Sequence, residues 1–130
     1  MTTSEIIQAY YAAFNRQDIP AMLELLSDDV LHEISQGGSE RGKDDFRLFL
    51  EHMNTSYAEQ VFDLEIMTNQ TRAAAEFRLE GRYLKTDGAF PEAQGQPYTL
   101  RVGAFFDLQN KKITRVSNHY NLNLWLEQIS

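Results

Sequence analysis

Residues 14–38, FNRQDIPAMLELLSDDVLHEISQGG, are the most informative stretch for the fold, because they combine an expected helix, an expected strand and the turns that bound both. Asp18 suits the N-cap of a short helix, and Pro20 falls in its first turn, where a missing N–H is tolerated. The apolar stripe of this helix consists of Met22, Leu25 and Leu26. Val30–Ser35 is then expected to form a strand that ends at the Gly37-Gly38 turn.

Further helices are expected on both sides of this stretch. Thr2 and Glu5 match a capping box, and the helix that follows carries a stripe of side chains spaced by four: Ile6, Tyr10 and Phe14. A third helix is expected to open at residues 42–45. Its apolar side chains have the spacing of a core-facing stripe: Phe46, Phe49, Leu50 and Met53.

From about Tyr57 onward apolar and polar residues alternate, which is typical of strands with one buried and one exposed face. The buried sets are expected to be Phe62, Leu64 and Ile66 on one strand, and Ala73, Ala75, Phe77 and Leu79 on the next. Two more strands are expected over residues 98–108 and 113–122, joined by a short turn. The loop at residues 85–97 has a length typical of a functional lid. Helices followed by strands predict an α+β fold with an antiparallel sheet.

The composition is that of one globular domain spanning residues 1–130, with 42% hydrophobic and 24% charged residues. The net charge of −7 argues against nucleic acid or an anionic membrane as the main partner. The chain has no cysteine, so disulfides, thiolate metal sites and a cysteine nucleophile are excluded. The N-terminus lacks the basic region and apolar run of a signal peptide, so a cytoplasmic location is expected.

The order of elements and three stretches resemble the nuclear transport factor 2-like superfamily, which includes SnoaL-like polyketide cyclases and ketosteroid isomerase. The stretches are residues 14–38, RGKDDFRLFLEHM at 41–53 and GAFFDLQNKKITRVSNHYNLNLW at 103–125. They look most like ketosteroid isomerase-related proteins, whose chemistry is unassigned. The resemblance covers nearly the whole chain. It implies a cystatin-like α+β cone, in which a strongly curved sheet packs on three N-terminal helices and encloses a cavity. It also implies a homodimer formed through the sheet.

Ketosteroid isomerase, one member of this superfamily, uses three catalytic groups whose positions can be located in this sequence. In that enzyme a carboxylate on the first strand moves the proton, while a tyrosine on helix one and a protonated aspartic acid hold the enolate oxygen. The tyrosine position corresponds to Tyr10, but the two carboxyl positions correspond to about Ile34 and Val102. Because two of the three groups are apolar here, steroid isomerisation by that route is not expected.

The same superposition, combined with the alternation of side chains along a strand, predicts the lining of the cavity. His32 and Ile34 face inward on the first strand, whereas Glu33 faces away. On the last two strands the inward residues are Val102, Ala104, Phe106, Val116, Asn118 and Tyr120. Small side chains are expected to leave room inside at Ala73, Ala75 and Ala104. The cavity is therefore expected to be mostly apolar with a few polar groups, as in small-molecule sites.

Four inward polar side chains are candidates for chemistry. His32 is the only one that titrates near neutral pH, which makes it the candidate general acid or base. Tyr10, Tyr120 or Asn118 could donate a hydrogen bond to a carbonyl or a developing oxyanion. Structural roles stay open for all four, as hydrogen-bonded core or network residues. A bulge that shifted the register by one residue would place Glu33 inside instead of His32.

Other candidate sites carry weaker signals. A metal site of His32, Glu33 and His119 needs side chains that strand alternation separates, so no metal is expected. His52 is expected to be exposed near the end of the third helix. The sequence has no glycine-rich phosphate loop, and no cofactor is expected. The outer face of the sheet has a composition typical of interfaces: Arg78, Arg82, Arg101, Phe105 and Glu76.

Three functions remain open. The first is an enzyme of isomerase, cyclase or hydrolase type that acts on a small, largely apolar carbonyl or epoxide compound, with His32 as acid or base and no cofactor. The second is a module that binds such a molecule without chemistry, motivated by the missing isomerase carboxyl groups. The third is a protein-interaction domain, which would need a filled cavity and an exposed apolar patch. The sequence favours the first two, with the enzyme slightly ahead.

Overall fold

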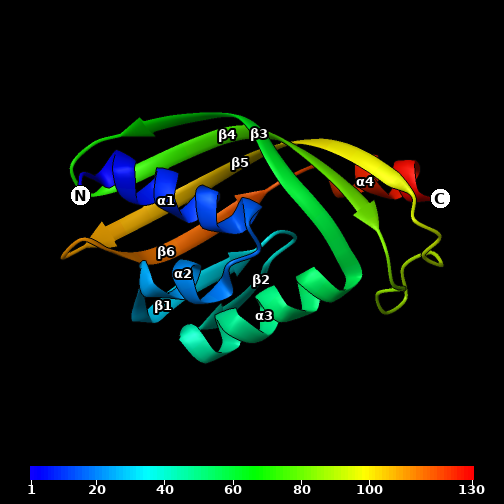
Figure 1. The fold of residues 1–130 in the computed structure, drawn as a ribbon, viewed down its shortest axis with the longest axis horizontal. Helices are drawn as coiled ribbons and strands as arrows, with labels where there is room; N and C mark the ends of the chain where they lie inside the picture. The colour runs from blue at the N-terminus through cyan, green and yellow to red at the C-terminus, as the bar shows by residue number, and fades with distance from the viewer.

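The computed structural model describes residues 1–130 and consists of four helices and one six-stranded sheet. The helices are α1 (Thr3–Asn15), α2 (Ile19–Glu24), α3 (Lys43–Ser56) and α4 (Leu122–Ile129). The strands are β1 (Leu26–Ile34), β2 (Gly38–Arg41), β3 (Tyr57–Thr68), β4 (Arg72–Tyr83), β5 (Pro97–Gln109) and β6 (Lys112–His119). Figure 1 shows the sheet curling over α1, α2 and α3, with α4 at the far end beside the C-terminus. The predicted α+β cone is confirmed.

The predicted caps form at the first two helices. The Thr2 hydroxyl accepts a hydrogen bond from the Glu5 amide at 3.1 Å, and the Glu5 carboxylate accepts one from the Thr2 amide at 2.8 Å. The Asp18 carboxylate accepts a hydrogen bond from the Ala21 amide at 3.1 Å and so starts α2. None of the four helices has the length and apolar character needed to cross a membrane.

The sheet order is β2-β1-β6-β5-β4-β3, and one pairing differs from the prediction. β1 runs parallel to β6, with His32 beside Val116, whereas the other pairs of neighbouring strands are antiparallel. β1 also begins at Leu26, earlier than predicted, because Leu26 is 1% exposed and pairs with Ile113 of β6. The two strands lie far apart in the sequence, so no local pattern indicates their relative direction.

Two elements lie outside the prediction. β2 follows a tight turn in which Gln36 and Gly37 have φ angles of 73° and 94°, and it pairs with β1 as a hairpin. At the C-terminus the Asn121 side chain accepts a hydrogen bond from the Leu124 amide at 3.1 Å and caps α4. The last strand therefore ends at His119, and not at residue 122 as predicted.

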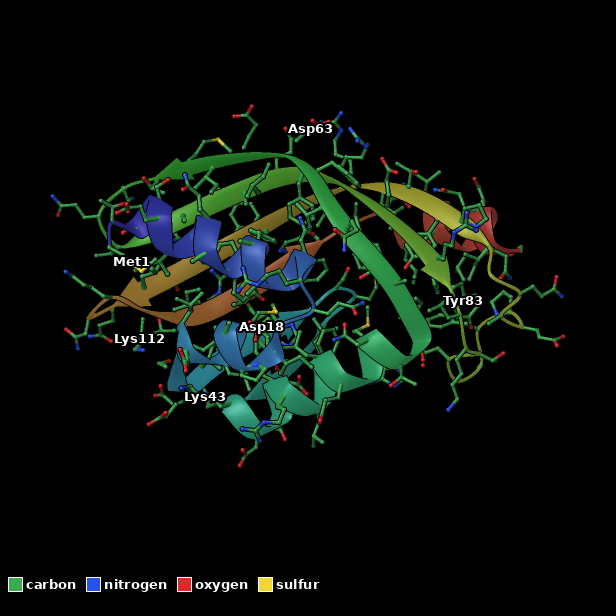
Figure 2. The ribbon with its side chains drawn as sticks, in the orientation of Figure 1. Met1, Asp18, Lys43, Asp63, Tyr83 and Lys112 are labelled. Carbon is green, nitrogen blue, oxygen red and sulfur yellow. The ribbon has the colours of Figure 1, made fainter.

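A bulge in β3 reverses the predicted facing of the first half of the strand. Asp63 has a φ angle of 56°, and the pairing with β4 changes register between Phe62 and Glu65, at the bend labelled in Figure 2. The inward residues are Tyr57, Glu59 and Val61 before the bulge, and Leu64 and Ile66 after it. The prediction that Phe62 is buried is wrong: its side chain is 41% exposed, and the Arg78 guanidinium lies 4.9 Å from its ring centroid.

Candidate active site

The concave side of the sheet and the first three helices enclose a cavity of about 500 Å³, a volume typical of small-molecule sites. Of its 28 lining residues 19 are hydrophobic, so the interior favours an apolar ligand. Phe46, Phe49, Leu50 and Met53, the predicted stripe of α3, all line it. The solvent-exposed members of the lining mark the rim: Gln17, Gln36, His52, Asn54 and Phe90.

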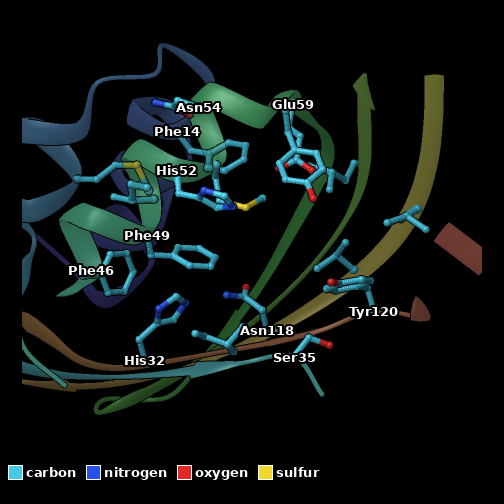
Figure 3. A pocket seen from close by; sticks show the side chains of 18 of the residues that line it. Phe14, His32, Ser35, Phe46, Phe49, His52, Asn54, Glu59, Asn118 and Tyr120 are labelled. Carbon is cyan, nitrogen blue, oxygen red and sulfur yellow. The ribbon is translucent and has the colours of Figure 1, made fainter. Parts of the chain in front are cut away.

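His32 lies in the wall of this cavity and is 1% exposed. Its ring packs against two phenyl rings of α3, with centroid distances of 4.4 Å to Phe46 and 4.6 Å to Phe49. Figure 3 shows the imidazole projecting from β1 into the cavity, with Asn118 beside it. The position of a titratable ring among apolar side chains restricts its contact with water.

Glu40 is the hydrogen-bond partner of His32. It lies directly opposite on β2, and its carboxylate Oε1 is 3.1 Å from His32 Nδ1. Since a carboxylate only accepts, Nδ1 carries the proton of the neutral ring, which leaves Nε2 as a free acceptor. Burial lowers the pKa of His32 below its usual value of 6.5, and the hydrogen bond and negative charge of Glu40 oppose this shift only in part. The ring is therefore neutral at physiological pH.

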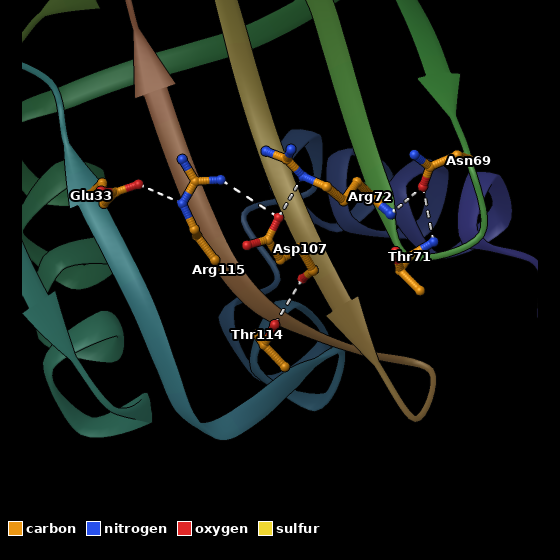
Figure 4. A network of polar contacts seen from close by, with 7 residues as sticks. All are labelled: Glu33, Asn69, Thr71, Arg72, Asp107, Thr114 and Arg115. Atoms are coloured by element: carbon orange, nitrogen blue, oxygen red, sulfur yellow. Dashed lines mark hydrogen bonds and ion pairs between the residues drawn. The ribbon is translucent and has the colours of Figure 1, made fainter.

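Glu33 lies on the opposite face of the sheet. Its carboxylate accepts a hydrogen bond from Arg115 Nε at 2.6 Å, and the same arginine reaches Asp107 at 3.6 Å, in the network drawn in Figure 4. The Arg115 hydrogen bond lowers the pKa of Glu33, which keeps the carboxylate ionised. The register of β1 thus places His32 inside and Glu33 outside, as the alternation predicts, and the exchanged arrangement does not occur.

Six residues predicted from the sequence line the cavity: Tyr10, His32, Ile34, Val102, Asn118 and Tyr120. Ala104 does not, which corrects its predicted place. It is 1% exposed and belongs with Ala73 and Ala75 to the buried core, where Tyr10 packs edge-on against Phe106 at 5.7 Å between centroids. The three alanines are therefore part of the packed core and do not line the cavity.

Two tyrosines of α1 line the cavity, although only Tyr10 has a predicted role. Their rings meet edge to face at 5.2 Å. The Tyr11 hydroxyl is buried and has no hydrogen-bond partner in the protein. Burial raises the pKa of both phenols, so both hydroxyls stay protonated and can donate. Tyr11 therefore joins Tyr10 as a candidate donor to a bound molecule.

A second polar group lies across the cavity from His32, as Figure 3 shows for Glu59. The Tyr98 hydroxyl donates to the Glu59 carboxylate at 2.7 Å, and the Tyr57 hydroxyl donates to Asp87 at 2.6 Å. His52 Nε2 lies 2.9 Å from the other oxygen of Asp87. Asp87 and Phe90 bring the loop after β4 into the lining, where Phe90 packs on Trp125 at 4.9 Å.

No group of three or more histidine, aspartate or glutamate side chains is arranged to hold a metal ion. In particular, His32 and Glu33 lie on opposite faces of the sheet. His119 also lies on the outer face, where its Nε2 is 2.9 Å from the Ser117 hydroxyl.

The comparison with protein families assigns this architecture. The model of the SnoaL-like domain matches residues 7–116, most of the chain. The chain belongs to the SnoaL-like domain family. No curated protein matches this SnoaL-like sequence.

Solved structures support the same assignment. A "putative polyketide cyclase" of Pseudomonas putida KT2440 is 51% identical, with a TM-score of 0.98 over 100% of this chain and 99% of the other. A second "putative polyketide cyclase", from Xanthomonas campestris pv. campestris, is 47% identical, with a TM-score of 0.95 over 98% and 96% of the two chains. An NTF2-like protein of unknown function from Burkholderia pseudomallei K96243 shares the fold alone, at 18% identity and a TM-score of 0.83 over 98% and 96%. The predicted superfamily is confirmed, whereas the narrower likeness to ketosteroid isomerase-related proteins stays a prediction.

Besides Tyr11, several groups of the site in this SnoaL-like domain escape the sequence prediction: Glu59, Asp87 and Trp125 in the cavity lining, and Glu40 behind His32. Glu40 carries a usable signal, because a hairpin at the Gly37-Gly38 turn would set it opposite His32. The β3 bulge makes Glu59 unpredictable from the sequence. If Phe62 is assumed to face inward, strict alternation along the strand places Glu59 on the outer face. Asp87 lies in the loop whose length is typical of a lid, but no pattern singles out Asp87 itself. Trp125 lies in an unpredicted helix and carries no local signal.

Proposed function

We propose that this SnoaL-like domain is an enzyme of isomerase, cyclase or hydrolase type that acts on a small, largely apolar molecule with His32 as general base. In an isomerase or cyclase the base removes a proton next to a carbonyl, and in a hydrolase it removes a proton from the attacking water. The observation that carries the proposal is the state of His32. The Nδ1 atom of His32 forms a hydrogen bond with Glu40 at 3.1 Å, and the imidazole ring packs against the rings of Phe46 and Phe49. The Nε2 atom has no hydrogen-bond partner in the protein and lies at the cavity wall. A neutral, oriented imidazole in an apolar cavity is the arrangement of a general base.

The remaining polar lining can stabilise the product of such a proton transfer. Removal of a proton next to a carbonyl places negative charge on the carbonyl oxygen, which needs hydrogen-bond donors. The Asn118 amide lies beside His32 in Figure 3, and it takes no part in the hydrogen bonds of His32, Tyr57 or Tyr98. Tyr10 and Tyr11 add phenol groups that stay protonated. We infer that these donors stabilise negative charge on the carbonyl oxygen of a bound molecule.

The similar structures favour the same class of reaction. Two proteins with 51% and 47% identity to this chain each carry the description "putative polyketide cyclase". Cyclisation of a carbonyl compound by carbon–carbon bond formation requires removal of a proton next to a carbonyl. A histidine base in an apolar cavity can serve this step with no cofactor.

A non-catalytic binding module is the alternative. Ile34 and Val102 both line the cavity, and they occupy the positions of the two carboxyl groups of ketosteroid isomerase. Their apolar side chains favour the binding module. The open cavity argues against the third function, a protein-interaction domain with a filled interior. Turnover, measured directly, separates the enzyme from the binder.

The test uses 2-tetralone, a small apolar ketone with acidic protons next to its carbonyl. Exchange of these protons for deuterium is followed by proton NMR in D₂O with and without protein. The wild-type protein is expected to accelerate exchange above the buffer rate, and His32→Gln is expected to lose about 100-fold or more of this acceleration.

His119→Gln is the matched control, because His119 lies on the outer face of the sheet, 5.6 Å from the Phe105 ring. It is expected to exchange at the wild-type rate. Binding of 2-tetralone without accelerated exchange would favour the binding module. Equal acceleration by wild type and His32→Gln would remove the histidine from the mechanism.

We also propose that the domain forms a homodimer through the outer face of the sheet. Phe62 and Phe105 are exposed there by 41% and 43%, and apolar side chains exposed on one face can mark a protein interaction site. Charged pairs surround them: Arg78 with Asp63 and with Glu80, and Arg101 with Glu76 at 3.6 Å. Aromatic residues and arginines are enriched at protein interfaces.

A further inference from the structure

Glu59 is a carboxyl group inside the cavity that the proposed proton transfer does not use. It projects inward from β3, because the bulge after Phe62 sets the register of this half of the strand. Its Oε2 accepts one hydrogen bond, from the Tyr98 hydroxyl at 2.7 Å. No lysine, arginine or histidine forms an ion pair with it, in contrast to Glu33 and Asp107 on the outer face. Oε1 is left without a donor.

The surroundings of Glu59 are acidic as well as apolar. Asp87 is at the same end of the cavity. It accepts one hydrogen bond from the Tyr57 hydroxyl, and its other oxygen is 2.9 Å from His52 Nε2. Tyr120 lies near both carboxylates, whose charges add to burial in raising the pKa of its phenol. The His52 ring, half exposed at the rim, lies 2.9 Å from Asp87 and forms no pair with Glu59. The polar end of the cavity is therefore rich in acceptors and poor in positive charge.

A partly buried carboxyl group that accepts only one hydrogen bond is incompletely satisfied. Each carboxylate oxygen can accept more than one hydrogen bond, and a buried charge without a partner is unfavourable. Burial accordingly raises the pKa of Glu59, and the single bond from Tyr98 opposes this shift only in part. A bound group that donates a hydrogen bond, or that carries a positive charge, would complete the site.

We propose that Glu59, with Tyr98, anchors a hydroxyl or ammonium group of the ligand at the end of the cavity across from His32. The ligand class is an elongated apolar molecule with a carbonyl at one end and a hydrogen-bond donor at the other. This inference rests on the proposed function for the use of the cavity, but it assigns Glu59 a role in binding rather than in proton transfer. A ligand with a carboxylate at the donor end is disfavoured by repulsion from Glu59 and Asp87.

The test compares three probes of nearly the same shape: 2-naphthylmethylamine, 2-naphthylmethanol and 2-naphthoate. Their dissociation constants are measured by titration calorimetry at pH 7.5. Trp125, the single tryptophan of the chain, lines the cavity and gives a second readout by fluorescence. The wild-type protein is expected to bind the amine and the alcohol, and to bind the amine at least tenfold more tightly than the carboxylate. Tighter or equal binding of the carboxylate overturns the proposal without any variant.

Glu59→Gln keeps the shape of the side chain and removes its charge. It is expected to weaken amine binding about tenfold or more, and so to abolish the preference for the amine. Glu65→Gln is the matched control, because it removes the same charge from an exposed position on the same strand. An equal loss in both variants, or no loss in either, overturns the proposal, because the preference would then come from overall charge alone.

The two proposals fail separately. His32→Gln is expected to keep the amine preference while it loses proton exchange. If Glu59→Gln retains the preference while His32→Gln still abolishes exchange, the anchor is wrong and the base remains. If His32→Gln exchanges as fast as wild type while Glu59→Gln loses the preference, the anchor stands and the base is wrong.

Discussion

Two neighbours act on His32 in opposite directions. The rings of Phe46 and Phe49 exclude water and lower the pKa of the imidazole, because the charged form loses hydration. Glu40 raises it, because the carboxylate stabilises the imidazolium and holds the Nδ1 proton. Burial is the larger effect, so the ring is neutral at pH 7 but still oriented. A hydrogen bond to Glu40 thus fixes which nitrogen can act as base.

Glu40→Gln should separate orientation from charge. Glutamine keeps an acceptor oxygen for the Nδ1 proton, but it no longer stabilises the imidazolium, so we expect the pKa of His32 to fall further below 6.5. The pKa is measured by NMR titration of the histidine ring carbons. Glu33→Gln serves as the control, since Glu33 lies on the other face of the sheet and should leave the pKa unchanged. A rise of the His32 pKa in Glu40→Gln would show that Glu40 does not stabilise the protonated ring.

At the scale of elements, periodicity predicts most of the structure and fails where the backbone departs from it. The α3 stripe and the inward residues of β4 and β5 follow the predicted spacing. The β3 bulge at Asp63 breaks the alternation, so Phe62 is exposed and Glu59 faces inward. The β1–β6 pairing depends on contacts between distant segments, which no local pattern encodes. The site is therefore predicted on β1, β5 and β6 and missed on β3 and in the loop after β4.

Gly81 on β4 makes room for the ring of Tyr98, the hydrogen-bond partner of Glu59. The two residues lie opposite each other on β4 and β5, and a Cβ at position 81 would come within 2.4 Å of the Tyr98 ring. The ring therefore packs over the glycine, which has no side chain to displace it.

Gly81→Ala is expected to destabilise the fold by about 1–3 kcal/mol, because the added methyl forces the tyrosine ring out of place. The free energy of unfolding is measured by urea denaturation. Gly103→Ala provides the comparison, since a Cβ at that position of β5 meets nothing within 4 Å. An equal change in the two variants would show that the packing of Tyr98 over Gly81 is not limiting.

The whole molecule assigns different tasks to the two faces of one curved sheet. The concave face holds the apolar cavity, with His32 and Glu59 across it, while the outer face carries ion pairs such as Arg72 with Asp107 at 2.9 Å. The family resemblance predicts this division, because it depends on the overall cone. Which residues face the cavity depends on the register of each strand. The sequence predicts this correctly for His32 on β1 but not for Glu59 on β3.

The proposed dimer is a property of the outer face. Light scattering at micromolar concentration is expected to give twice the chain mass of 15.0 kDa, and Phe105→Asp is expected to give the monomer mass. Leu48→Asp tests for a general effect of added charge, because Leu48 is 64% exposed on α3, away from the sheet. A wild-type mass near 15.0 kDa would contradict the proposed interface.

The pH dependence of 2-tetralone exchange is the decisive measurement for His32, because it reports the protonation state of the base during the reaction. A neutral His32 is required, so the protein-dependent rate should fall as the pH drops through the His32 pKa and level off above it. The expected midpoint lies below 6.5, and this transition should be absent from His32→Gln. A protein-dependent rate that shows the same pH profile in wild type and His32→Gln would contradict the account.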